Sequence, residues 1–376
     1  MSRKEFFIWL CLLPVVFISF WGGLYWPSVS IHAWTPPKLP AFEGALKRNF
    51  RLVKADMLGD ETVVEPEDNL VDVAGNMYVS CLDGYIRRID KQGKTTVFAK
   101  TGGRPLGMRW YQKQIIVAVA GKGLLSVSPK GKVSTLVKSF DKKPLLYADD
   151  LDITNSGDVY FSDASKHFGI HQTRYDLISR VPSGRLFRYS MKDKKLSLVL
   201  DNMYFANGVT LTPKQDAVLV TETGAYRIRK VWISGPKKGT HEIIAKNLPG
   251  YPDNIRRRPA GGYWLAIVAP RLPEMDVAAH PRAWLKTLMF LFPSSWLPKA
   301  KQVGMALRLD ENGKIVESLH DAEGRTLFNI SSVRERDGYL YFGHIYHKAT
   351  KVGKLALPKQ SPTTSSTTKP TTSPTK

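Results

Sequence analysis

Acid and amide side chains recur at the start of apolar, strand-like runs in this sequence. In the stretch NLPGYPDNIRRRPAGGYWLAI, Asp253 and Asn254 follow a proline and lead into such a run. Comparable positions carry Glu67 with Asp68, Asp149 with Asp150, and Asn207. A single Asp or Asn at such a place is more often a turn residue, because it bonds its own backbone. Repetition at several places favours a shared site for a ligand that needs oxygen donors.

The stretches that carry these residues repeat a common pattern of a polar or turn residue, an apolar residue, a short polar segment with Gly, and an aromatic or aliphatic run. The first apolar positions of the six copies are Leu70, Met108, Leu151, Val209, Ile255 and Ile330. Glycine turns such as Asp83-Gly84, Lys130-Gly131 and Asn312-Gly313 separate the runs, as in hairpins. Repeats of about forty residues with four short strands are typical of propeller blades. The sequence therefore predicts an all-β fold, a six-bladed β-propeller. A two-sheet sandwich is the competing architecture, but it does not explain six copies.

Closure of the ring brings the repeated positions together. Residues 51–59 precede the first repeat and are predicted to supply a strand that completes the last blade. The first strand of every blade lines the central channel, so corresponding residues converge on the axis. Asp, Glu and Asn oxygens without His or Cys indicate a hard cation, and flexible coordination favours calcium over zinc. We therefore expect a Ca²⁺ site, or a site for another divalent cation, with ligands from Glu67, Asp149, Asn207, Asp253 and Asn254.

The two ends of the chain differ from this repeat. Residues 6–26 contain no charged residue and are long enough to cross a bilayer as a helix, and Arg3 and Lys4 precede them. They predict an uncleaved transmembrane anchor with residues 1–5 in the cytoplasm; a cleaved signal peptide is the alternative. Residues 27–50 are then a linker, residues 51–358 the propeller, and residues 359–376, rich in Ser, Thr and Pro, a disordered tail. The propeller is expected in the periplasm, a lumen or the extracellular space.

Charge gives a further indication about partners. The chain has 55 Lys and Arg against 33 Asp and Glu, a net charge of +22. The basic residues are scattered over every segment and accompany no nucleic-acid-binding motif, so we expect no nucleic-acid partner. A basic surface beside anionic lipid headgroups is the better explanation, and the membrane is the expected partner.

A long insertion between the fifth and sixth repeats bears on the same partner. Residues 283–299, AWLKTLMFLFPSSWLPK, are amphipathic and too short to span a bilayer. Their apolar face would carry Trp284, Leu285, Leu288, Leu291 and Phe292, and Lys286, Lys299 and Lys301 flank it. The stretch predicts either an interfacial helix or substrate lid, or a helix packed over the top of the propeller.

Several stretches resemble the strictosidine-synthase-like family, and more distantly the paraoxonases and gluconolactonases. They include FANGVTLTPKQDAVLVTET, LPGYPDNIRRRPAGGYW, GRPLGMR and DVYFSDAS, in the family's order. The resemblance implies a six-bladed propeller and places the family's metal ligands on Glu67, Asp149, Asn207, Asp253 and Asn254. It matches Asp150 to an acid that helps to hold a second, structural calcium in paraoxonases. Two positions depart from the pattern: Leu106 replaces a catalytic histidine of the paraoxonases, and Ser331 replaces the catalytic glutamate of strictosidine synthases.

These observations predict a membrane-anchored, calcium-dependent hydrolase of aryl esters or lactones, in which Asp149 or Asp253 helps a water molecule to attack the substrate carbonyl. One alternative is a non-catalytic metal-binding propeller that acts as a binding module. Another is a strictosidine-synthase-type lyase, against which Ser331 argues. His167, His171, His344 and His347 are weaker candidates for the channel mouth, because they show no metal-ligand spacing.

Overall fold

The computed structural model describes residues 31–346 and 349–358. The predicted cytoplasmic segment 1–5, anchor 6–26 and tail 359–376 lie outside the described residues, as does His347. Among the helices that are described, none combines the length and the apolar character needed to cross a bilayer.

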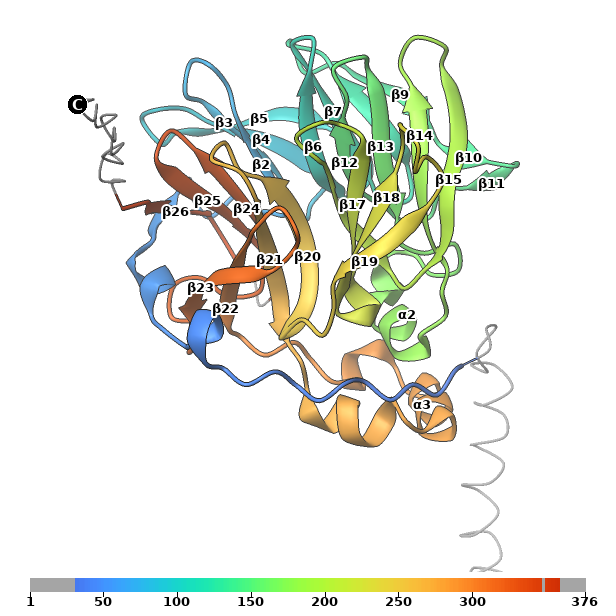
Figure 1. The fold of residues 1–376 in the computed structure, drawn as a ribbon. Helices are drawn as coiled ribbons and strands as arrows, with labels where there is room; N and C mark the ends of the chain where they lie inside the picture. The colour runs from blue at the N-terminus through green and yellow to red at the C-terminus, as the bar shows by residue number, and fades with distance from the viewer. Residues whose placement is uncertain (1–30, 347–348, 359–376) are drawn as a thin grey trace, which may run out of the picture.

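Six four-stranded antiparallel sheets form the body of the protein, which confirms the six-bladed propeller (Figure 1). Blade 1 comprises β2 (Asn69–Val71), β3 (Met77–Ser80), β4 (Tyr85–Ile89) and β5 (Thr95–Lys100). Blade 2 comprises β6 (Pro105–Tyr111), β7 (Gln114–Val119), β8 (Gly123–Val127) and β9 (Val133–Val137). Blade 3 comprises β12 (Ala148–Ile153), β13 (Asp158–Asp163), β14 (Gly184–Ser190) and β15 (Lys195–Met203).

The remaining three blades complete the ring. Blade 4 comprises β16 (Ala206–Leu211), β17 (Ala217–Glu222), β18 (Arg227–Trp232) and β19 (His241–Ala245). Blade 5 comprises β20 (Gly250–Arg257), β21 (Tyr263–Pro270), β22 (Gly304–Leu309) and β23 (Ile315–Asp321). Blade 6 comprises β24 (Ile330–Arg336), β25 (Tyr339–His344), β26 (Val352–Ala356) and β1 (Asp56–Leu58). A two-stranded hairpin, β10 (Ser139–Phe140) and β11 (Lys143–Pro144), lies between blades 2 and 3.

The last blade takes strands from both ends of the described chain. Strand β1 pairs antiparallel with β26, so that Met57 faces Gly353, which confirms the closing strand predicted within residues 51–59. The Nε of Arg334 in β24 also donates to the carbonyl of Asn69 in β2 at 2.6 Å, which ties blade 6 to blade 1. Both contacts join the two ends of the described chain and so close the ring.

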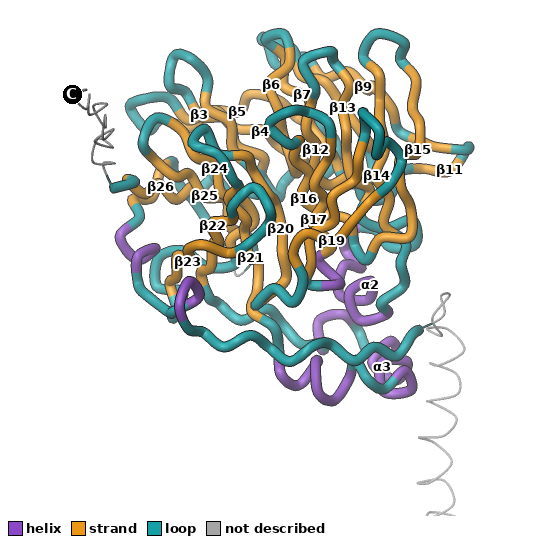
Figure 2. Tube along the Cα trace, viewed as in Figure 1, coloured by secondary structure: helices purple, strands orange, loops and turns teal. Residues whose placement is uncertain are grey.

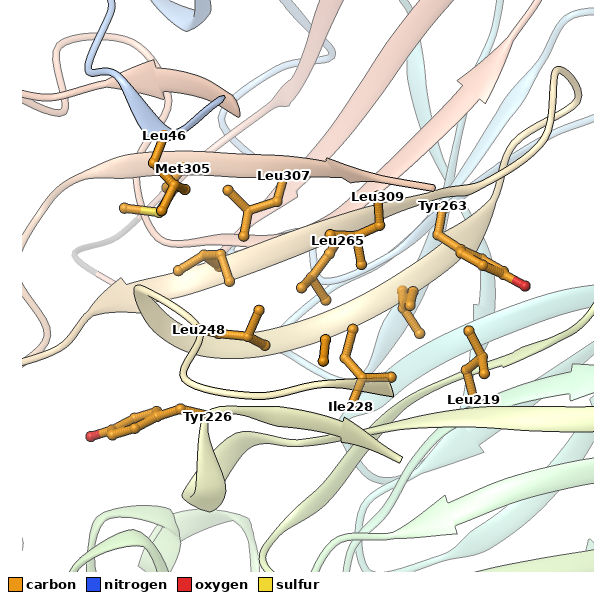
Figure 3. Close-up of a cluster of buried hydrophobic side chains, with 13 residues drawn as sticks. Leu46, Leu219, Tyr226, Ile228, Leu248, Tyr263, Leu265, Met305, Leu307 and Leu309 are labelled. Carbon is orange, nitrogen blue, oxygen red and sulfur yellow. The ribbon is translucent and has the colours of Figure 1, made fainter. Parts of the chain in front are cut away.

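Apolar clusters between neighbouring blades hold the ring together. In the cluster drawn in Figure 3, Leu219 and Ile228 of blade 4 lie against Leu265 and Leu307 of blade 5. Each of these side chains is 0 or 1% exposed. Full burial of a leucine or isoleucine side chain contributes about 2 kcal/mol. The blades are therefore stabilised mainly by their neighbours, as the repeat pattern requires.

The predicted linker runs along the outside of the propeller (Figure 1). The backbone N–H of Trp34 donates to the carbonyl of His280 at 2.8 Å, and Leu46 of the 3-10 turn η1 (Gly44–Leu46) is buried beside Met305. The Nδ2 of Asn49 donates to the carbonyl of Ser318 at 3.0 Å, ahead of the turn η2 (Arg51–Lys54). Residues 31–50 are thus packed onto the protein.

Helices gather at one end of the channel, where they cover the start of the inner strands (Figure 2). They are η3 (Ile170–Gln172) and α2 (Thr173–Ser179) between β13 and β14, η4 (Thr223–Ala225) between β17 and β18, and η5 (Glu274–Ala279), α3 (Ala283–Phe290) and η6 (Ser294–Trp296) between β21 and β22. Phe168 and Ile178 from the first group pack against Leu272 and Phe290 from the last. The insertion is therefore a cap over the channel.

The apolar face predicted for residues 283–299 divides in two. Trp284, Leu288 and Phe292 are 64, 44 and 47% exposed, whereas Leu285 packs inward against the cluster under the cap. Lys286, one of the lysines that flank the apolar residues in the sequence, does not reach solvent. Its side chain is fully buried and its Nζ donates to the carbonyl of His32.

Candidate metal centre

A backbone irregularity marks the start of most inner strands. The register against the second strand shifts in five blades, between Pro105 and Met108, Ala148 and Leu151, Ala206 and Val209, Pro252 and Ile255, and Ile330 and Ser332. Such bulges leave residues out of the ladder and redirect their side chains. The predicted ring residues Asp149, Asn207, Asp253 and Asn254 lie within these bulges.

Glycines at two bulges allow neighbouring inner strands to approach closely. A Cβ atom on Gly107 would lie 2.1 Å from the Oδ1 of Asp150. A Cβ atom on Gly208 would lie 2.5 Å from the carbonyl oxygen of Asp253 and 2.6 Å from the amide nitrogen of Ile255. A larger residue at either position would push apart two blades that build the channel.

The structure brings the predicted site residues together. Glu67, Asp149, Asn207 and Asp253, from four different blades, line one cavity of about 290 Å³ at the helix-capped end of the channel. Their side chains are between 3 and 6% exposed. Asn254 is fully buried, and its Nδ2 donates to the Oε1 of Glu67.

The three acids of this cavity are difficult to ionise together. Burial raises the pKa of Glu67 well above its usual value, and the charges of Asp68, Asp253 and Asp149 add to the effect. Burial also raises the pKa of Asp149, followed by repulsion from Asp253. Burial raises the pKa of Asp253 to about 7, against the lowering effect of a hydrogen bond from Asn207. A bound cation would relieve this unfavourable concentration of negative charge.

The two asparagines supply acceptors without adding charge. The amides of Asn207 and Asn254 hydrogen-bond to Asp253 and Glu67 respectively. The Oδ1 of each asparagine and the Oε2 of Glu67 are buried without a hydrogen-bond partner among the described residues. Buried oxygen acceptors without donors are costly, and a hard cation is the group that satisfies several at once.

The oxygens of this cavity fit a divalent cation only when carboxylates and amides are taken together. In the part of the chain that the structure describes, no group of three or more His, Cys, Asp and Glu side chains has the proximity expected of a metal site. The acids alone therefore do not make a site. The amide oxygens of Asn207 and Asn254 must complete it, and this oxygen-only chemistry suits calcium.

The second residue of two ring pairs has a different role from the first. Asp68 accepts from the backbone N–H of Met108 in the next blade at 3.0 Å, and Asp150 accepts from that of Val209 at 2.7 Å. Both carboxylates also bind Arg256, at 2.8 Å for Asp68 and 2.6 Å for Asp150. Burial would raise the pKa of Asp68, but the guanidinium groups of Arg256, Arg334 and Arg109 hold it below its usual range.

This arrangement bears on the resemblance of Asp150 to an acid that helps to hold a structural calcium. In this protein the carboxylate of Asp150 accepts from both terminal nitrogens of Arg256, at 2.6 and 3.0 Å. Arg256 is only 3% exposed. A permanent guanidinium charge therefore compensates Asp150 at the axis.

Several residues of the cavity were not predicted. Arg104 faces the acids, and its charge lowers the pKa of Asp149 and Asp253, though less than burial raises them. Tyr147, Phe205 and Tyr346 give the cavity aromatic walls. The sequence signal for Arg104 is its position two residues before Leu106, in the blade that offers the ring no oxygen ligand.

The remaining candidates fall in different places. Leu106 lines the cavity as an apolar side chain, and His171 lies at its rim among the cap residues. The hydroxyl of Ser331 is buried and donates to the carbonyl of Glu67 at 2.8 Å, a structural contact. His344 is buried away from the cavity, with its Nε2 3.2 Å from the carbonyl oxygen of Thr350.

The fold defines the class of protein as a six-bladed propeller of the kind found in gluconolactonases. A gluconolactonase from Xanthomonas campestris superposes with a TM-score of 0.58 at 15% identity, over 88% of this chain and 98% of that one. A calcium-binding protein, regucalcin from Agrobacterium tumefaciens, gives 0.55 at 12% identity, over 80 and 94%.

Sequence similarity identifies the family within this class. The chain is 34% identical over 331 residues to adipocyte plasma membrane-associated protein of Salmo salar, which covers 81% of this chain and 79% of the relative. It is 36% identical over 256 residues to strictosidine synthase-like 13 of Arabidopsis thaliana, covering 66 and 62%. Residues 149–236 match strictosidine synthase, and residues 44–89 match the N-terminal region of strictosidine synthase-like proteins. The chain belongs to the strictosidine-synthase-like family.

Proposed function

We propose that this protein is a membrane-anchored, calcium-dependent hydrolase of aryl esters or lactones. The observation that carries the proposal is the cavity at the channel end, where acid and amide oxygens from four blades meet and three buried acceptors lack donors. The fold shared with a gluconolactonase and with a calcium-binding protein supports the same choice.

The cation would be held by Glu67, Asp149, Asn207, Asp253 and Asn254. When bound, calcium supplies a Lewis acid that polarises an ester carbonyl. The chain holds these oxygens in place through contacts behind them. The hydroxyl of Ser162 donates to the carbonyl of Asn207 at 2.6 Å, and that of Thr221 to the carbonyl of Asp253 at 2.9 Å.

Asp253 is the better placed of the two acids to act as a general base. Its pKa is about 7 in the calcium-free protein, and a cation bound beside it would lower this pKa, so that the carboxylate would be ionised near neutral pH and able to accept a proton from water. In the reaction, the water oxygen bonds to the carbonyl carbon, the ester C–O bond breaks, and the leaving oxygen takes up the proton. Arg104 adds a positive charge to the same cavity, where negative charge develops on the carbonyl oxygen.

A second cavity offers room for an apolar part of the substrate. It has a volume of about 320 Å³, lies under the cap, and shares Thr173, Arg174, Leu177, Val268 and Tyr346 with the first. Its other walls come largely from apolar residues, including Ile178, Leu272 and Met275. An ester or lactone with an aryl or alkyl group would place its carbonyl among the acids and its apolar group here.

Membrane attachment is proposed from the exposed side of the cap. Five large apolar side chains point to solvent there: Val277, Trp284, Leu288, Phe292 and Trp296. The first described residues, Ile31 and His32, contact the same cap, and the apolar stretch 6–26 precedes them. Tryptophan and other apolar residues on a helix beside an apolar anchor suit the lipid–water interface, where a substrate could pass directly to the cavities.

Hydrolysis assays of the full-length protein in detergent test the function. Phenyl acetate and a panel of lactones should be hydrolysed in calcium, not in chelator, and activity should return when calcium is restored. Asp253→Asn should lose the activity, whereas the exposed Asp201→Asn should keep it. Calcium-independent hydrolysis would contradict the proposal.

A non-catalytic metal-binding module is the second candidate, and Leu106 favours it. This apolar side chain stands in the cavity where a histidine would serve the chemistry of paraoxonase-like enzymes. The two candidates differ in outcome: a binding module retains calcium stoichiometrically but hydrolyses none of the substrates. A lyase is the weakest candidate, because the buried Ser331 stands where that chemistry needs a glutamate.

A further inference from the structure

The far end of the channel holds a large cavity with an unusual concentration of arginines. Its volume is about 560 Å³. Six arginines line it, namely Arg109, Arg256, Arg257, Arg258, Arg334 and Arg336, against three carboxylates, Asp152, Glu335 and Asp337. Cations remain in excess even when the buried Asp68 and Asp150, which bind Arg256 from behind, are counted.

This cavity shares no lining residue with the candidate metal centre and opens away from it, and Arg256 with its partners Asp68 and Asp150 lies between the two. Its arginines occupy the C-terminal ends of β6, β20 and β24, whereas the acids of the metal centre lie near the starts of the inner strands. Strand β21 runs from the turn beside Arg258 back to the cap, and its eight residues span about 25 Å (Figure 1). The two cavities therefore open at opposite ends of the propeller.

The arginines differ in how far their charge is already satisfied. Arg258 pairs with Glu335 at 2.7 Å, and Arg109 with Asp152 at 3.3 Å. Arg257 is exposed, reaches only the carbonyl of Thr212 at 3.4 Å, and has no carboxylate within ion-pair distance among the described residues. Its guanidinium is the most available donor for an anion.

Two buried N–H groups on the same walls also lack acceptors. The Nε of Arg256 and the indole nitrogen of Trp110 have no hydrogen-bond partner in the part of the chain that the structure describes. Arg256 is 3% exposed, so its side chain is held rigidly beside the cavity. Burial lowers the pKa of Arg334 to about 10; the charge of Asp68 opposes this shift, and repulsion from Arg109 and Arg256 adds to it. An anion would relieve both the unpaired donors and this repulsion.

An aromatic cavity adjoins the arginines and indicates what the anion is attached to. It has a volume of about 420 Å³ and shares Val71, Trp110 and Arg336 with the arginine-lined cavity. Tyr78 lies edge-on to both Phe98 and Trp110, with ring centroids 4.8 and 5.2 Å away. These side chains form a wall suited to a flat, apolar group.

We propose that the far end of the channel is a binding site for a soluble phosphate monoester with an aromatic body. The phosphate lies among the arginines, with Arg257 as its main free contact, and the aromatic body lies against Trp110 and Phe98. The source is soluble because the cap, on which the proposed function places the membrane contact, is at the other end of the protein.

Titration of the full-length protein with phenyl phosphate tests this site. Isothermal titration calorimetry should show saturable binding, and the tryptophan emission should change with the same dissociation constant. The emission change should disappear in Trp110→Phe while the binding remains. Inorganic phosphate should bind more weakly than phenyl phosphate, because it lacks the aromatic body, and phenol should not compete. The absence of saturable binding at millimolar concentrations would overturn the proposal.

Charge variants locate the binding. Arg257→Gln should weaken the affinity for phenyl phosphate at least about tenfold, the expected loss for one charge-assisted contact. Because Arg257 makes a single long hydrogen bond, this variant should fold normally. Arg325→Gln, which removes an exposed charge elsewhere, should bind as the wild type does. If Asp253→Asn abolishes binding and Arg257→Gln does not, phenyl phosphate occupies the candidate metal centre and the proposal fails. If Arg257→Gln loses binding to phosphatidic acid vesicles as strongly as it loses phenyl phosphate, the natural ligand is a lipid headgroup and the proposal of a soluble ligand fails.

Discussion

Asp253→Asn should stabilise the calcium-free protein above neutral pH. The pKa of Asp253 is about 7 in the folded protein, against 3.8 for an ordinary Asp in the unfolded chain. Between pH 3.8 and pH 7 the folded state therefore retains a proton that the unfolded chain has lost. Stability therefore falls as the pH rises from about 4 to about 7 and is constant above. The difference of about 3 units between the two pKa values lowers the free energy of unfolding above pH 7 by about 4 kcal/mol. The amide removes the charge and with it the penalty.

Thermal unfolding in chelator measures the effect. A protein of this size changes its midpoint by about 1.5 °C per kcal/mol, so the variant should melt about 6 °C above the wild type at pH 8. At pH 4.5 the difference should shrink to about 2 °C, because the folded acid is then protonated and the pH lies only about 0.7 units above the pKa of the unfolded chain, a penalty of about 1 kcal/mol. The exposed Asp201→Asn should show no difference at either pH.

Calcium should remove most of this difference. Binding to the folded state alone stabilises the wild type by about 3 kcal/mol at a hundredfold excess over the dissociation constant. The variant has lost a charged oxygen ligand, so calcium should stabilise it much less. Equal midpoints of the variant and the wild type at pH 8 in chelator would refute the argument that Asp253 is held at an energetic cost for a cation.

Three further predictions concern the site, the ring and the cap. Asn207→Ala should reduce the calcium content measured by atomic emission at least tenfold and with it any hydrolysis, whereas the exposed turn variant Asn155→Ala should match the wild type; full calcium content in Asn207→Ala would remove this residue from the site. Gly208→Ala should lower stability by about 3 kcal/mol in urea unfolding, because its Cβ would meet the backbone of blade 5, while Gly169→Ala has open space and should be neutral. In vesicles of brominated lipid, Trp284→Phe should show less quenching of tryptophan emission than the wild type, with hydrolysis unchanged; identical quenching would place the cap away from the bilayer.

The architecture could be predicted from the sequence because each blade arises from a local sequence repeat. The apolar positions from Leu70 to Ile330 lie in the inner strands of all six blades, and the glycine of Asp83-Gly84 has the positive φ of +87° that its hairpin turn requires. The convergence of Glu67, Asp149, Asn207 and Asp253 followed from symmetry, since equivalent positions of a closed ring must face one axis.

The parts that could not be predicted depend on contacts between distant residues. Three consecutive arginines, 256 to 258, look alike in the sequence, yet Arg256 is buried against Asp68 and Asp150 while Arg257 is exposed. Only the bulge before Ile255 decides which of them turns inward. The burial of Lys286 could not be predicted either, because lysine is rarely buried and only the linker places the carbonyl of His32 within its reach.

The origin of blade 6 has a consequence for the order in which the protein forms. Strand β1 is synthesised before all the other described strands, and its partner β26 is the last of them. Blades 1 to 5 can fold as they leave the ribosome, while β1 waits with an unpaired edge. The ring cannot close before β26 is made, so we expect the four-blade oxygen cluster to be completed only then. A chain that stops before Val352 should therefore lose the whole site at once, even though every proposed ligand is already present in it.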